Sequence, residues 1–153
     1  MLLQWIIALL VLIPFFLFLS VLIPSALFLF AIFWFLSLGA DLRSTHKFYQ
    51  ECPKQFRQNE RNKFFVLFTE KLGFKKASAI FPLIFEVPLI LFFALFPLQV
   101  LYSYAFNNAS SNFPACLATS LGIAGAGHMQ AVFTNHHFKA GKNASSERRY
   151  SLT

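Results

Sequence analysis

The sequence predicts an all-α membrane protein, a bundle of three or four transmembrane helices with an amphipathic cytoplasmic loop. Hydrophobic residues make up 57% of the 153 positions and charged residues only 12%, which is unusual for a soluble domain. All thirteen Lys and Arg residues fall in residues 41–76 and 139–153, whereas residues 1–40 carry no charged side chain. Long uncharged runs next to basic segments are typical of a multi-pass membrane protein whose basic segments lie in the cytoplasm.

Residues 1–40 are predicted to form one or two transmembrane segments. The stretch is too long for a single span, since about 20 apolar residues cross the hydrocarbon core. Pro14 and Pro24 each lack a backbone hydrogen-bond donor and bend or interrupt a helix. We favour two helices, over residues 2–20 and 22–38, to one kinked helix. Two spans would place the N-terminus in the cytoplasm, and one span would place it outside.

Residues 41–76 are predicted to be a basic cytoplasmic loop, in which nine Lys and Arg residues against four acidic residues give a net charge of +5. Apolar residues between positions 64 and 72 are flanked by basic ones, which predicts a helix lying in the headgroup plane. A short helix packed on the spans is the alternative, and Gly73 is expected to end the helix in either case. The side chains expected to contact lipid headgroups are Arg57, Arg61, Lys63, Lys71, Lys75 and Lys76.

Residues 77–138 are predicted to contain two transmembrane helices, separated by an uncharged turn at residues 107–112. Residues 139–153 follow as a basic cytoplasmic tail. The last span repeats small residues every fourth position, a pattern that lets two helix backbones approach closely. The pattern leaves open whether the partner helix is internal or belongs to another subunit. The repeated residues are Ala118, Gly122 and Ala126.

The net charge of +7 does not indicate nucleic acid binding, because the basic residues border apolar runs. Attraction to anionic phospholipid headgroups explains them better, at about 1 kcal/mol for each basic residue near the surface. The expected partners are therefore the lipid bilayer with its anionic headgroups and other membrane protein subunits. The protein is expected to be an integral, multi-pass membrane protein, and the sequence does not indicate which membrane holds it.

Glu86 lies within an otherwise apolar stretch. An ionisable side chain inside a span is costly, and it usually faces a bundle interior, a cavity or a paired group. Glu86 could therefore contact a ligand, carry a proton or bind a metal. A neutral Glu86 hydrogen-bonded to a neighbouring helix is the alternative.

Several His residues and one carboxylate are expected at the same membrane face. Carboxylate and imidazole together suit Zn, Cu or Fe, so a metal site is one hypothesis. The spacing matches no known metal motif, and hydrogen bonds to loop backbone explain these residues better. No cofactor is predicted. The candidate metal ligands are Asp41, His46, His128 and His136.

The chain resembles an uncharacterised family of small multi-pass membrane proteins over about residues 30–138. That family carries Asp and Thr at the end of a span, an acidic-x-Asn element in the following loop and a His/Asn pair in the last span. The usual Pro after the loop Asn is replaced here by Lys63. The family has no established activity, so the resemblance implies a shape and little function. The matching residues are Asp41, Thr45, Glu60, Asn62, His128 and Asn135.

The chain also shows a second resemblance, to the EXPERA domain of the sigma-2 receptor and sterol isomerase proteins. That resemblance implies that Asp41 and Glu86 line a pocket for a sterol-like or amine ligand, with Pro88 and Tyr104 in similar surroundings. The chain stops where the fourth helix of that domain begins, so the N-terminal segment would have to replace it.

Three functions follow from these observations. The leading hypothesis is a non-catalytic accessory subunit of a larger integral membrane complex, because packing surface is abundant and no coherent catalytic set is visible. The second is an intramembrane protein that binds a sterol-like ligand or cationic amphiphile around Glu86, Asp41 and Tyr104. The third is a metal-dependent membrane enzyme that uses Asp41 and the His residues.

Overall fold

The computed structural model describes residues 2–23, 25–51, 53–60, 62–107 and 112–150, with side chains from residue 10 to 135 apart from 55, 58 and 59. Helices make up the described structure, which contains no strand. In chain order they are α1 (Leu2–Leu22), α2 (Ala26–Glu51), α3 (Pro53–Asn59), α4 (Lys63–Leu72), α5 (Phe74–Phe81), the π-helical turn η1 (Pro82–Glu86), α6 (Val87–Leu95), α7 (Pro97–Phe106) and α8 (Phe113–Tyr150).

The N-terminal stretch is two helices, as predicted, with the break after Leu22. Pro14 lies inside α1 and does not end it. The second helix runs well past the predicted end at residue 38 and continues to Glu51. It continues because its polar half still has an apolar side, where Leu42, Phe48 and Tyr49 pack against a cluster formed by α3, α4 and α5.

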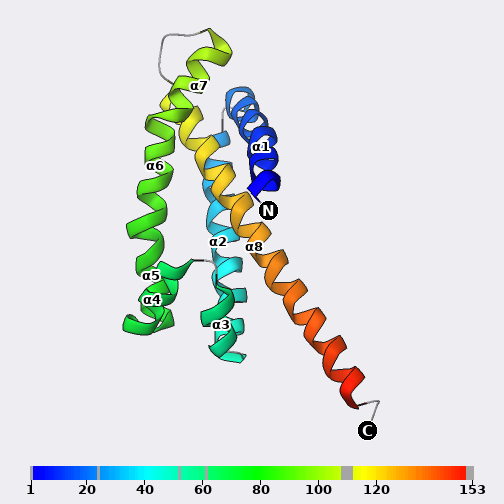
Figure 1. The fold of residues 1–153 in the computed structure, drawn as a ribbon. Helices are drawn as coiled ribbons and strands as arrows, with labels where there is room; N and C mark the ends of the chain where they lie inside the picture. The colour runs from blue at the N-terminus through cyan, green and yellow to red at the C-terminus, as the bar shows by residue number, and fades with distance from the viewer. Residues whose placement is uncertain (1, 24, 52, 61, 108–111, 151–153) are drawn as a thin grey trace.

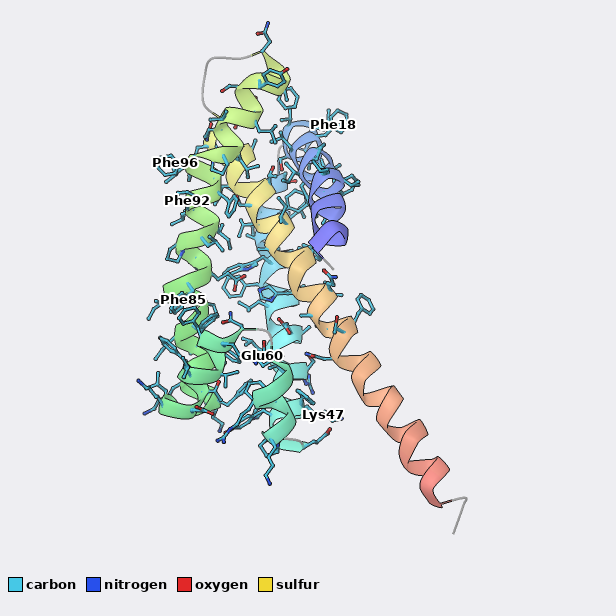
Figure 2. The ribbon with its side chains drawn as sticks, in the orientation of Figure 1. Phe18, Lys47, Glu60, Phe85, Phe92 and Phe96 are labelled. Carbon is cyan, nitrogen blue, oxygen red and sulfur yellow. The ribbon has the colours of Figure 1, made fainter. Side chains whose placement is uncertain are left out.

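Two segments of the described chain are long and apolar enough to cross a membrane, Ala26–Glu51 and Phe74–Phe106. A shorter apolar helix covers Leu10–Leu22. The second segment is interrupted by η1 and by a break before Pro97. Figure 2 shows Phe92 and Phe96 along its outer side, whereas Phe85 packs against Phe64 and Phe68 of α4.

Helix α8 is the central element of the bundle. It packs most extensively against α2 and also contacts α6 and α1, and its C-terminal part extends beyond the other helices (Figure 1). Two glycines allow this packing. A Cβ atom at Gly122 would lie 2.6 Å from the ring of Phe16 on α1, and one at Gly125 would lie 2.7 Å from the ring of Phe33 on α2.

The small-residue pattern of α8 therefore serves contacts within the chain at Gly122. Ala118 is buried and Ala126 is half-buried. The sequence pattern did not include Gly125, although a Cβ atom there would collide with the ring of Phe33 on α2.

Helices α4 and α5 pack on the end of α2 rather than lying apart from the bundle. Phe65 and Val66 of α4 are buried with Phe56 of α3 and Phe74 and Ala77 of α5. Gly73 separates the two helices with a φ of 78°, as expected of the residue that ends α4. An apolar side of α4 stays exposed, formed by Phe64, Leu67 and Leu72, so packing against α2 and an exposed apolar side occur in the same helix.

Candidate functional site

His128 bridges the two carboxylates that the sequence singled out. Its Nδ1 atom lies 2.8 Å from Oδ2 of Asp41, and its Nε2 atom lies 2.6 Å from Oε1 of Glu86. The side chains of all three residues are less than a fifth exposed. Three segments far apart in the chain, α2, η1 and α8, therefore meet through a single imidazole.

Helix geometry explains why α2 and α8 contribute these residues. Trp34 and Asp41 are seven residues apart, or about two turns, and thus lie on one side of α2. Leu121 and His128 have the same spacing on α8. Trp34 and Leu121 are buried together in one apolar cluster, so Asp41 and His128 meet two turns further along the same α2–α8 contact.

Glu86 is the last residue of the π-helical turn η1, and this turn directs it toward the cluster. Pro88 has no N–H group to donate to the carbonyl four residues earlier, and Val87 N–H bonds instead to the carbonyl of Pro82, five residues back. In an α-helix, residues five apart point about 140° away from each other. Within this turn, Phe81 and Glu86 both line the same cavity. Turns of this kind occur frequently at functional sites.

Trp34 is a member of the cluster that the sequence analysis missed. Its indole Nε1–H donates to Oε1 of Glu86 over 2.6 Å, and the side chain is buried. The same carboxylate oxygen thus contacts both Trp34 and His128, while no described residue donates a hydrogen bond to its second oxygen, Oε2. The spacing of Trp34 and Asp41 would have indicated this role if residues 26–51 had been taken as one helix.

A second group of polar residues continues from Asp41 along α2. Thr45 Oγ1 donates to Asp41 Oδ1 over 3.3 Å. Asn135 of α8 donates through Nδ2 to Ser44 Oγ at 2.9 Å and to Thr45 Oγ1 at 3.3 Å. These contacts hold α2 and α8 together two turns beyond His128 and fix the orientation of the Asp41 carboxylate.

A cavity of about 410 Å³ opens beside these groups. This volume is within the range of small-molecule sites. Its polar wall includes Asp41, Glu60, Glu86 and His128, and no Lys or Arg is among the described residues that line it. The apolar part of the wall is formed by Leu38, Leu42, Phe48, Phe65, Phe81, Pro82 and Ala131.

All six residues that carry the first resemblance line this cavity, although they come from three separate parts of the chain. Glu60 and Asn62 have a local structural task there. Asn62 Oδ1 accepts the N–H of Phe65 and so caps α4, and the Glu60 carboxylate accepts the N–H of Asn62. Lys63 takes the first position of α4, a helix position that Pro also favours.

The hydrogen bonds of His128 determine how many protons the cluster holds. A carboxylate can only accept, and a neutral imidazole donates from one nitrogen alone. Both ring nitrogens face a carboxylate oxygen, so each contact needs one hydrogen. Either the imidazole carries both, or it carries one and a carboxyl group carries the other. Both arrangements hold two protons and give the three groups a net charge of −1.

The remaining predicted site residues lie elsewhere. Tyr104 is 88% exposed on α7 and does not line the cavity. His46 stacks on Phe74 at a ring distance of 4.6 Å and does not line the cavity. The side chain of His136 and the whole of Arg61 lie outside the described residues. Within the described part of the chain, no three His, Cys, Asp or Glu side chains are arranged to hold a metal ion.

The residues predicted to contact headgroups are exposed on α3, α4 and α5 where they are described. Arg57 forms an ion pair with Glu70 at 3.1 Å, and Lys63 donates to the carbonyl of Arg57. These contacts tie the end of α3 to α4.

Comparison of the chain with protein-family models, with curated proteins and with solved structures finds no match.

Proposed function

We propose that this protein binds a small organic cation with an apolar group in the cavity beside Asp41, Glu86 and His128. The observation that carries the proposal is the meeting of two carboxylates in a cavity with no basic residue among its described lining. The three groups carry a net charge of −1, so a cation is favoured over an anion or a neutral molecule. The cavity size suits a ligand of about the dimensions of a drug molecule.

The two carboxylate oxygens of Glu86 have different roles in this proposal. Oε1 is held in place by Trp34 and His128, and Oε2 remains as the acceptor for an ammonium hydrogen. The apolar group of the ligand packs against Leu38, Phe48 and Phe81, which form part of the apolar lining. A sterol-like molecule without a positive charge would use only this apolar wall and should bind less tightly.

We further propose the membrane arrangement that the charge distribution favours. The chain crosses the bilayer three or four times, with residues 41–76 and the C-terminal tail in the cytoplasm. Because Asp41, Glu60 and Asn62 line the cavity, the binding site then lies near the cytoplasmic surface of the membrane. The exposed apolar side chains of α1, α2 and α6 contact lipid. An accessory role in a larger membrane complex remains a prediction.

The proposal is tested by titrating the purified full-length protein with octylammonium and with 1-octanol, which has the same chain length without the charge. Binding is followed by the fluorescence of Trp34 in a Trp5→Phe background, because these are the two Trp residues of the chain. Octylammonium should bind more tightly than octanol. Glu86→Gln should weaken octylammonium binding about ten- to a hundredfold, since hydrogen bonds to charged groups contribute about 1.5–3 kcal/mol.

The matched control is Glu70→Gln, which makes the same chemical change at an exposed carboxylate of α4 outside the cavity. It should leave the affinity unchanged. Equal affinities for octylammonium and octanol in the unmodified protein would contradict the proposal. Equal losses in the Glu86 and Glu70 variants would contradict it as well.

A further inference from the structure

We propose that binding of a cation in this cavity expels a proton from the Asp41–His128–Glu86 cluster, so that the protein exchanges one cation for one proton. This inference rests on the proposed function. It starts from the two hydrogens that the geometry requires between His128 and the carboxylates at 2.8 and 2.6 Å. The bound cation takes the place of one of these hydrogens as the positive partner of the carboxylates, and the proton leaves to solvent through the cavity.

The charges balance in this exchange. The cluster with two protons carries a charge of −1, and with one proton it carries −2. A bound monovalent cation returns the total to −1. The occupied and the empty site therefore carry the same charge, and no additional charge has to be buried.

Electrostatic repulsion drives the exchange. A cation on Oε2 of Glu86 lies within a few ångströms of the His128 ring, because the ring contacts the other oxygen of the same carboxylate. Two positive charges about 5 Å apart at an effective dielectric constant of 20 lower the affinity for the proton by roughly a hundredfold or more. The coupling is reciprocal, so the proton lowers the affinity for the cation by the same factor.

One further titratable group lines the described part of the cavity besides the three of the cluster. Glu60, from the segment between α3 and α4, is the remaining titratable residue among its described lining, and its carboxylate accepts a backbone N–H of Asn62. The residues Thr45, Gln130, Thr134 and Asn135 that also line the cavity do not titrate. His128 is the one imidazole among the described residues that line the cavity. It contacts the carboxylates of both Asp41 and Glu86.

The experiment measures the dissociation constant of octylammonium between pH 5 and pH 9, where an alkylammonium with a pKa near 10.4 keeps its charge. The affinity should rise with pH, by up to tenfold per pH unit and about a hundredfold in total. Calorimetric titration in two buffers of different ionisation enthalpy should give about one proton released per ligand. The calorimetric measurement needs no variant.

Two variants separate the roles of the groups. His128→Gln keeps hydrogen-bonding capacity without a titrating ring, so it should flatten the pH dependence. Glu70→Gln, at an exposed carboxylate outside the cavity, should leave the dependence as steep as in the unmodified protein. Binding of octylammonium without proton release and with a constant affinity across this pH range would overturn the exchange and leave the proposed function intact. Absence of octylammonium binding at every pH would contradict the proposed function itself, and the exchange with it.

Discussion

Gly125→Ala is the substitution that tests how the packing of α8 positions the site. Gly125 lies about one turn before His128 on α8 and faces Phe33 of α2. A Cβ atom there would lie 2.7 Å from two ring carbons of Phe33 and 3.2 Å from Oγ of Ser37, which is buried. We expect Ala to push α8 away from α2 and so to separate His128 from Asp41.

The size of the displacement follows from these distances. Carbon atoms pack at about 3.5–4.0 Å, so the contact at 2.7 Å requires a movement of about 1 Å. A movement of this size would lengthen the 2.8 Å contact between His128 and Asp41 to about 3.8 Å, which is beyond hydrogen-bonding distance. Overpacking of this kind costs about 1–3 kcal/mol in stability. Octylammonium affinity should fall together with stability.

The assay compares the free energy of unfolding of Gly125→Ala with that of Gly127→Ala in the same detergent. Gly127 lies on the same helix, and a Cβ atom there meets nothing within 4 Å. Both substitutions gain the same helix propensity, about 1 kcal/mol, so their difference isolates the collision with Phe33. Gly127→Ala should be the more stable variant by about 1–3 kcal/mol.

A double variant locates the cause. Phe33→Leu combined with Gly125→Ala should recover part of the loss, since the two residues are in contact and their effects should not add. Equal stability of the Gly125 and Gly127 variants would refute the reasoning. A loss at Gly125 that the Phe33 substitution does not reduce would refute the assignment of the contact.

Two further predictions concern the segment that covers the cavity and the membrane arrangement. Asn62→Ala should destabilise the protein by about 1 kcal/mol because it removes the side-chain cap of α4, whereas Asn62→Asp should preserve it; equal unfolding free energies of the two variants would contradict this role. In a protein without its native cysteines, Lys75→Cys should react with a membrane-impermeant maleimide from the cytoplasmic side and Phe106→Cys from the opposite side. Labelling of both from one side would contradict the proposed arrangement.

Local features of the sequence were sufficient to predict the helical class and several helix ends. The break between α1 and α2 and the end of α4 at Gly73 follow from Pro and Gly, whose backbone preferences act without help from distant residues. Glu86 and Asp41 were predicted to line one pocket, and both line the cavity. A carboxylate in an apolar stretch needs polar partners wherever that stretch lies. The sequence around Glu86 was therefore enough to indicate that its side chain meets other polar groups.

The choice among the polar residues depended on tertiary structure. His46 and His128 could not be distinguished by type or spacing, yet only His128 lies where α8 meets both α2 and η1. Tyr104 was predicted to belong to the same ligand site as Glu86, but the break before Pro97 separates the helix that carries it from α6. The π-helical turn that brings Glu86 to the cavity arises because Pro88 removes one hydrogen bond. The position of the Glu86 side chain then depends on its partners, Trp34 of α2 and His128 of α8.

The sequence by itself thus determined that the chain is helical and which stretches of it carry no charge, because these properties are local. Tertiary structure decided which side chains meet. Asp41, Glu86 and His128 are separated by more than forty residues at each step, and no local rule connects them. Their meeting depends on the close approach of α8 to α2 at Gly125, a contact set by the absence of a single side chain.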